Sequence, residues 1–140
     1  MQERTDTPAS ALWAAAYQGD EAGVRRLLAE GLDVNVWDRH GRSALTFAIK
    51  GGHLSIVRRL LEAGAWADPF EEGDIFKSPL MCAAEEGHLE IVETLLSLGA
   101  DPTKHGGIGV CTAEFYARAR HPYVAAILLR AEDKWRQARK

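Results

Sequence analysis

The chain has 140 residues, 46% of them hydrophobic, and its 17 basic and 20 acidic side chains give a net charge of −3. So small a net charge supplies no broad basic surface for nucleic acid or an anionic membrane. No stretch approaches the roughly 18 apolar residues of a membrane span, and the opening residues lack the apolar core of a secretory leader. We therefore expect a monomeric globular protein, cytoplasmic or nuclear, that binds neither nucleic acid nor membrane.

Four seven-residue strings recur almost in phase along the chain. They read SALWAAA at 10–16, SALTFAI at 43–49, SPLMCAA at 78–84 and TAEFYAR at 112–118, and their starts are 33, 35 and 34 residues apart. Self-similarity at one such period is typical of a stack of identical supersecondary units, not of a single mixed core. The sequence therefore predicts four structural repeats.

Each repeat carries signals for two helices. A side-chain oxygen that can cap the first helix stands at Ser10, Ser43, Ser78 and Thr112. The second helix has apolar residues at i, i+1, i+4 and i+5, which are Ile56, Val57, Leu60 and Leu61 in one repeat and Ile91, Val92, Leu95 and Leu96 in the next. This stripe is too narrow to form a core alone, so we expect neighbouring helices to cover it.

The second helices lie in the strings GGHLSIVRRLLEAGA at 51–65 and EGHLEIVETLLSLGA at 86–100. With the first helices they resemble the ankyrin repeat, whose pattern is a Thr-Pro-Leu-His-x-Ala turn and helix, a Gly-His loop and a second helix ending in Leu-Leu-x-x-Gly-Ala. The resemblance covers roughly residues 9 to 132, closely in three repeats and loosely in the fourth.

This resemblance implies an all-α fold, an ankyrin-repeat solenoid of four stacked helix-turn-helix units with short β-hairpin fingers between them. We expect a flexible segment at 1–8, followed by a single ankyrin repeat domain at 9–140. The expected repeats span about 9–36, 37–69, 70–102 and 103–140.

The last repeat departs from the pattern. Glu114 stands where the other copies have leucine, and residues 123–138 continue as a longer amphipathic helix whose apolar face would hold Val124, Leu128, Ala131 and Trp135. Because the terminal units of a solenoid need a wettable outer face, we interpret this repeat as a cap.

The sequence contains no recognisable set of catalytic or metal-binding residues. His53 and His88 occupy equivalent places in adjacent repeats, which stacking separates by about 10 Å, too far for both to reach one metal ion. We interpret them as loop-capping residues and Cys82 as a small buried side chain. We predict no catalytic residue, no metal site and no cofactor.

Side chains that the repeat does not fix are the candidates for binding another protein. In ankyrin proteins the ends of the first helices and the finger tips line a concave groove, and the resemblance implies the same role here by position. The candidates are Tyr17, Gln18, Trp37, Arg39, His40, Arg42, Lys50, Phe70, Glu71, Glu72, Asp74, Phe76, Glu85 and Glu86.

Two of these features have alternative explanations. Trp37 fits a partner anchor and equally a cover for the neighbouring finger. The apolar residues of the 70–77 finger fit either a partner contact or packing back on the stack. The candidates of the second repeat are basic and those of the third acidic, so a partner complementary to both is a protein, not a polyanion.

We therefore predict a protein-protein interaction module whose partner is an unidentified protein. A small inhibitor or immunity-type protein that blocks a toxin or an enzyme is the alternative. A further hypothesis, an enzyme or small-ligand carrier that uses the 70–77 finger and Cys111, lacks an acid and base pair in the sequence.

Overall fold

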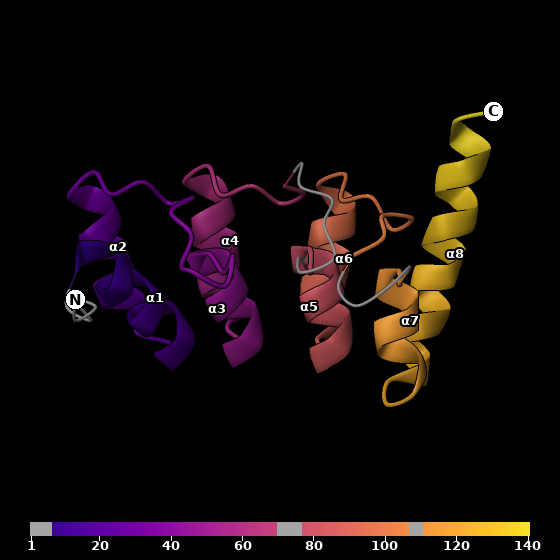
Figure 1. The fold of residues 1–140 in the computed structure, drawn as a ribbon, viewed down its shortest axis with the longest axis horizontal. Helices are drawn as coiled ribbons and strands as arrows, with labels where there is room; N and C mark the ends of the chain where they lie inside the picture. Colours follow the sequence, from indigo (N-terminus) through magenta and orange to yellow (C-terminus); the bar gives the residue numbers. More distant parts are fainter. Residues whose placement is uncertain (1–6, 70–76, 107–110) are drawn as a thin grey trace. The chain divides into compact units, whose positions relative to one another are not determined.

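The structure is a computed structural model that describes residues 7–69, 77–106 and 111–140. In these ranges the chain forms eight helices and, beyond one isolated bridge between Gly106 and Cys111, no β-structure. The chain divides into two compact units, Met1–Trp66 and Ala67–Lys140 (Figure 1). The predicted all-α fold of paired, stacked helices is confirmed.

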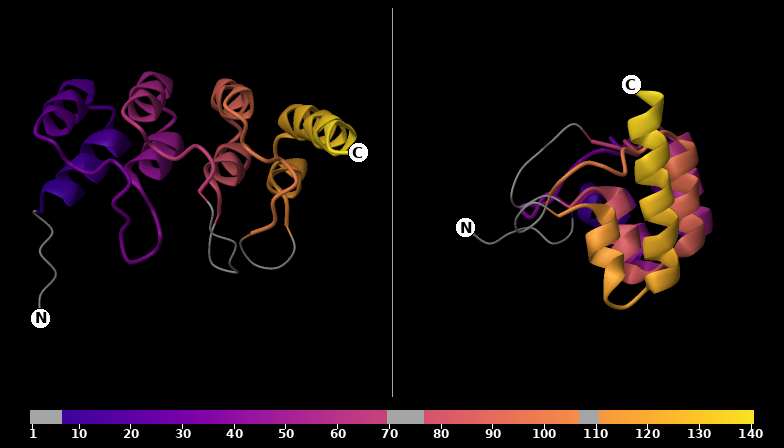
Figure 2. Two further views of the ribbon diagram at one scale, coloured as in Figure 1. Left: turned by 90° about the horizontal axis from the view of Figure 1, so that it is seen from above. Right: turned by 90° about the vertical axis from the view of Figure 1, so that its right-hand side faces the viewer.

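The first unit consists of two helix pairs. Helix α1 (Pro8–Gln18) pairs with α2 (Glu21–Ala29), and α3 (Ala44–Gly51) pairs with α4 (Leu54–Glu62). Within this unit α1 lies beside α3 in one layer and α2 beside α4 in the other (Figure 2). The buried side chains between them include Leu12, Ala16, Val24, Leu45, Ile49, Ile56 and Leu60.

The second unit repeats the arrangement with a longer last helix. Helix α5 (Pro79–Glu86) pairs with α6 (Leu89–Ser97), and α7 (Ala113–Arg118) pairs with α8 (Pro122–Ala138). Helix α8 has 17 residues, compared with 9 in α6. The buried side chains include Leu80, Met81, Cys82, Ile91, Leu95, Ala117 and Leu128, so the interpretation of Cys82 as a buried side chain is confirmed.

The predicted helix caps are confirmed only in the two middle repeats. The hydroxyls of Ser43 and Ser78 accept from the amides three residues later, at 3.5 and 3.2 Å. Helix α1 begins earlier than expected, because Thr7 supplies its cap and Pro8 suits the first helical position. Ser10 therefore lies inside the helix, and Thr112 makes no side-chain cap bond. Both of those predictions were wrong.

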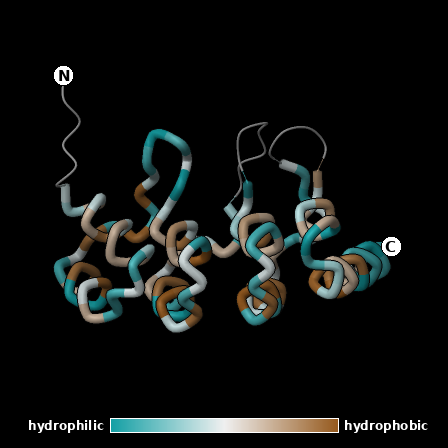
Figure 3. The backbone as a smooth tube through the Cα atoms, turned by 90° about the horizontal axis from the view of Figure 1, so that it is seen from below, coloured by the Kyte–Doolittle hydropathy of each residue, from teal (hydrophilic) through white to brown (hydrophobic). Residues whose placement is uncertain are grey.

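The finger between α2 and α3 was expected to be a β-hairpin, and that detail was also wrong. Asp38 uses its carboxylate to accept from the amides of His40 and Arg42, at 2.8 and 2.9 Å. A side chain that takes up these amides replaces the strand ladder with a local turn. The result is a tight, hydrophilic loop tip (Figure 3).

The fourth repeat also buries a residue that was expected on a wettable face. Glu114 is only 9% exposed, and its two oxygens accept from Nε and Nη2 of Arg118 at 3.0 and 2.6 Å. A buried carboxylate needs such a partner, and the same hydrogen bond raises the pKa of Arg118. The residue that replaces leucine is thus kept inside by its ion pair.

A histidine side chain joins consecutive repeats within each unit. The Nε2 of His53 lies 2.9 Å from the carbonyl oxygen of Tyr17, and the Nε2 of His121 lies 3.1 Å from that of Glu85. A carbonyl can only accept, so the imidazole must donate from this nitrogen. Both bonds span 36 residues, so they are the same contact repeated. His53 and His121 thus link repeats. The loop-capping interpretation is not confirmed for His53 or His88, because neither side chain caps the helix that it precedes.

A second polar contact recurs at the base of the fingers. Asn35 accepts from the amide of Trp66 at 3.0 Å, and Asp68 accepts from the amide of Asp101 at 3.1 Å. Asp68 also pairs with Lys104 at 2.8 Å. Each contact links the base of one finger to the backbone of the next repeat. Together with the histidine contacts, these bonds fix how each repeat is aligned with the next in its unit.

Replacing Gly19 with alanine should destabilise the protein more than the same change at Gly31. Both glycines have positive φ, 81° and 86°, so alanine meets a comparable backbone cost of about 1–2 kcal/mol at either position. At Gly19 the added Cβ would also lie 2.7 Å from Cε1 of His53, whereas at Gly31 it would meet nothing within 4 Å. Urea unfolding should therefore give a larger loss of unfolding free energy for Gly19→Ala.

The double variant Gly19→Ala with His53→Ala tests the cause. In the His53→Ala background, Gly19→Ala should lower the unfolding free energy only as much as Gly31→Ala does, because the imidazole ring that the new Cβ would meet is absent. Equal losses for the two single glycine variants would contradict a stacking contact through His53.

Candidate functional site

The first unit has an open hollow where α1 and α3 run side by side. Its volume is about 520 Å³, and its walls are Trp13, Ala14, Tyr17, Gln18, Arg42, Phe47 and Lys50. Four of these seven residues are predicted partner-binding positions, namely Tyr17, Gln18, Arg42 and Lys50. The structure therefore brings together the predicted residues from two helix ends and one finger.

Aromatic rings form the floor of this hollow. Phe47 stacks against Trp13 with ring centroids 6.2 Å apart, and the ring of Tyr17 meets Phe47 edge-on at 6.5 Å. The indole N–H of Trp13 donates to the carbonyl of Val36 at 3.3 Å, which fixes the orientation of the ring. Tyr17 is 54% exposed, so the cluster offers an apolar surface to solvent.

Cations lie over and beside these rings. The guanidinium of Arg42 lies 5.0 Å from the centroid of Phe47, and its Nε donates to Asp38 at 2.8 Å. Burial alone would raise the pKa of Asp38, but the amides of Arg42 and His40 and the guanidinium together lower it below its ordinary value. Arg42 is thus held in place, while Lys50 is exposed at the end of α3.

The other predicted residues of the first unit lie outside the hollow. Arg39 and His40 are exposed at the loop tip, and Trp37 is half-buried at its base. Both explanations offered for Trp37 are compatible with half-burial, so its role stays a prediction.

In the second unit the predicted residue Glu85 is already engaged. It forms an ion pair with Lys77, whose Nζ also lies 4.9 Å from the ring centroid of Tyr116. Partial burial would lower the pKa of Lys77, but the hydrogen bond with Glu85 raises it above its ordinary value. Glu86 is exposed beside this pair. This surface thus holds one acid that is paired within the chain and one that points to solvent.

Five further candidates, together with Ile75 of the same finger, lie outside the described residues. They are Phe70, Glu71, Glu72, Asp74 and Phe76.

Three residues that line the hollow, Trp13, Ala14 and Phe47, were not identified from the sequence. The signal was present, because Trp13 and Ala14 precede Tyr17 and Gln18 by one helical turn, and Phe47 precedes Lys50 by three residues. Residues at these spacings share one face of a helix. These residues could have been predicted by including, for each candidate at a helix end, the residues about one turn earlier on the same face.

The repeat pattern and the helix pairs agree with a comparison of protein families. A family model described as ankyrin repeats, in three copies, matches residues 12–106. The chain belongs to the ankyrin repeat family. Ankyrin repeats are generally protein-protein interaction modules and are typically non-catalytic.

Individual ankyrin proteins match shorter segments. Ankyrin repeat and KH domain-containing protein mask-1 of Caenorhabditis elegans is 41% identical over 83 residues, 59% of this chain and 3% of that protein. Inversin of Danio rerio is 38% identical over 61 residues, 43% of this chain and 6% of inversin. Ankyrin repeat domain-containing protein 39 of Homo sapiens is 37% identical over 57 residues, 41% of this chain and 31% of that protein. The chain thus spans less than a third of each of these relatives.

The hollow between α1 and α3 can be described by the chemical groups of its lining. Its lining contains aromatic rings, an amide and two cations, and no carboxylate, imidazole or thiol. Over the described ranges, no three His, Cys, Asp or Glu side chains gather as metal ligands could. None of the helices described is both long and apolar enough to cross a bilayer.

The Asp38→Asn variant should weaken the loop that carries Arg42. We expect the unfolding free energy to fall by about 1 kcal/mol at neutral pH, a modest loss because Arg42 is partly exposed. The folded pKa of Asp38 lies below its ordinary value of 3.8, so its carboxylate stabilises the fold above that value and this contribution is lost as pH falls through the folded pKa. The difference from wild type should therefore be full near neutral pH and shrink in acid.

Asp33→Asn is the matched control. Asp33 lies in the same loop and accepts from the amide of Asn35 at 2.9 Å, whereas the guanidinium of Arg42 pairs with Asp38. Urea unfolding over a range of pH should show a smaller loss for this variant. A loss for Asp38→Asn that is no larger, or that does not change with pH, would contradict the role of the Asp38–Arg42 pair.

Proposed function

We propose that the chain is a protein-binding module whose main contact is the hollow between α1 and α3. The observation that carries the proposal is a cluster of three aromatic rings next to two cations, in which Tyr17 is exposed and Trp13 and Phe47 are half-buried. The hollow would receive an apolar side chain of the partner, and Arg42 and Lys50 would pair with carboxylates beside it. The partner segment is thus an acidic peptide with an apolar anchor.

The chemistry of the rings supports this choice. Aromatic side chains at the centre of a contact surface are the usual energetic anchors of protein interfaces. Trp13, Tyr17 and Phe47 hold one another in place, so little conformational freedom is lost when a partner binds. Two cations are too few for a phosphate backbone, which proteins bind through many basic contacts.

The remaining candidates would add contacts to the same partner. Arg39 and His40 at the exposed loop tip would contact the same partner. Glu86 would pair with a basic group of the partner, whereas Glu85 would have to release Lys77 to do so. Trp37 and the candidates of the 70–77 finger keep the roles predicted for them. A monomeric state and a cytoplasmic location belong to the same proposal.

A peptide selection tests this proposal. A displayed library of random peptides is selected on the whole chain, and one enriched peptide is titrated against wild type, Tyr17→Ala and Lys50→Glu by fluorescence anisotropy. Enriched peptides should carry an apolar residue near acidic ones. Each variant should bind at least about tenfold more weakly, the loss typical of one anchor residue or charge pair.

Arg25→Glu is the control, because it makes the same charge change as Lys50→Glu at an exposed position on α2. It should bind like wild type, and thermal unfolding should show that all the variants are folded. Equal affinity of all four proteins for every enriched peptide would overturn the proposal.

A further inference from the structure

Helix α8 has one apolar face, of which one edge and the C-terminal part are only half-buried. Its buried residues are Val124, Ala125, Leu128 and Glu132. A second stripe, spaced four residues apart, is made by Ile127, Ala131 and Trp135, all of them half-buried. The predicted face of Val124, Leu128, Ala131 and Trp135 is present, because residues seven apart on a helix lie within about 20° of each other, but Ala131 and Trp135 are less buried than the other two. The rest of the chain does not fully cover Ile127, Ala131 and Trp135, so this part of the apolar face is available to a partner.

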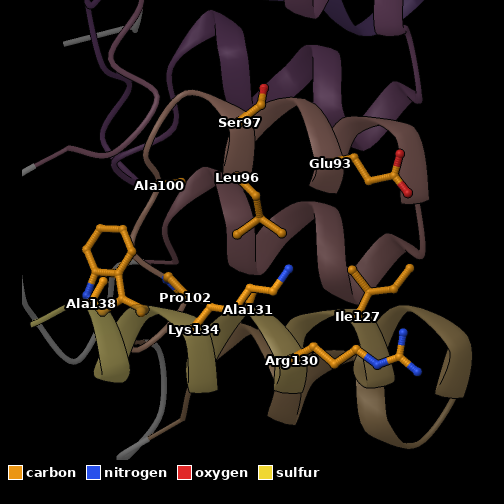
Figure 4. Close-up of a pocket in the computed structure, with 11 residues that line it drawn as sticks. Glu93, Leu96, Ser97, Ala100, Pro102, Ile127, Arg130, Ala131, Lys134 and Ala138 are labelled. Atoms are coloured by element: carbon orange, nitrogen blue, oxygen red, sulfur yellow. The ribbon is translucent and has the colours of Figure 1, made fainter.

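The second stripe forms one wall of a hollow. The opposite wall is the end of α6 and the segment after it, with the half-buried Leu96 and the buried Ala100 and Pro102 (Figure 4). The hollow has a volume of about 580 Å³. It lies against α6 and α8, and none of its lining residues belongs to α1, α3 or the finger between α2 and α3.

Charged side chains stand along the edges of this hollow. Arg130 and Lys134 are exposed and one helical turn apart on α8, while Glu93 is exposed on α6. In the described part of the chain, no ion pair joins Glu93 to either cation. The edge along α8 therefore carries two cations in a row that can pair with carboxylates at the same spacing.

The shape of the hollow decides what kind of segment fits it. Helix α8 forms one wall and the end of α6 begins the other, and the ridges of a third helix can pack between those of a neighbouring pair. A partner strand would need a sheet edge to pair with, and the described residues offer none. Apolar residues one turn apart on a partner helix would match Leu96, Ile127 and Ala131.

We propose that the hollow between α6 and α8 docks an amphipathic helix of a partner protein, with an apolar stripe flanked by carboxylates on the side of Arg130 and Lys134. A basic residue on its other flank meets Glu93. This docking site uses other elements than the hollow between α1 and α3 and does not depend on that proposed function.

A helix library gives the test. A single-helix scaffold with randomised surface positions is displayed and selected on the whole chain, with counter-selection on Ser97→Trp. That variant places a large ring in the hollow from an exposed position of α6, so it blocks the space without removing a buried atom. Enriched helices should carry apolar residues at i, i+3 or i+4, and i+7, with aspartate or glutamate alongside. One enriched helix is then titrated against variants.

Lys134→Glu should weaken binding of this helix about tenfold or more, whereas Arg120→Glu should leave it unchanged. Arg120 is exposed in the turn after α7 and does not line the hollow, so it controls for net charge. Tyr17→Ala should also leave this affinity unchanged, which separates the result from that for the hollow between α1 and α3. Failure to enrich any helix, or equal loss in Lys134→Glu and Arg120→Glu, would overturn the proposal.

Discussion

A hydrogen bond from a histidine ring to a backbone carbonyl of the preceding repeat sets how helix pairs stack in both units. His53 reaches Tyr17 and His121 reaches Glu85 across the same interval of 36 residues. The ring occupies space that only a glycine leaves open, since a Cβ at Gly19 would collide with it. With the rings in place, the narrow apolar stripes of the second helices face one another and become buried. One polar contact thus determines which apolar residues meet.

This arrangement also determines which side chains remain free to bind. Stacking uses the backbone of Tyr17, not its ring, so the phenol stays half exposed beside Phe47. The loop then adds Arg42, which Asp38 holds over the same aromatic cluster. The proposed binding surface therefore follows from the contacts that build the fold, and its chemistry can change from one ankyrin protein to another without disturbing the stack.

Features that depend on local spacing could be predicted from the sequence. The repeat period predicted the helix pairs and buried residues such as Leu60 and Leu95. The apolar residues of a helix form one stripe, and that stripe must face the neighbouring helices to be buried. Features that depend on a contact with another residue could not be predicted. Ser10 lost the cap because Thr7 comes first, and Glu114 is buried because Arg118 lies one turn away. In the candidate site, the resemblance to ankyrin repeats identified Tyr17 and Lys50 at the helix ends. Trp13 and Phe47 lie about one turn earlier on the same helix faces, and they were not identified from the sequence.

The central claim is that the partner protein is bound by those side chains of α1 and α3 that the stacking of the repeats does not bury. The chain has four tryptophans. Trp13 lines the hollow between α1 and α3, and Trp135 lines the one between α6 and α8. The most direct measurement is an NMR titration of isotope-labelled chain with an enriched random peptide, read at the indole N–H signals. The account predicts that the Trp13 signal shifts and the Trp135 signal does not. A peptide that binds while the Trp13 signal stays fixed would contradict it.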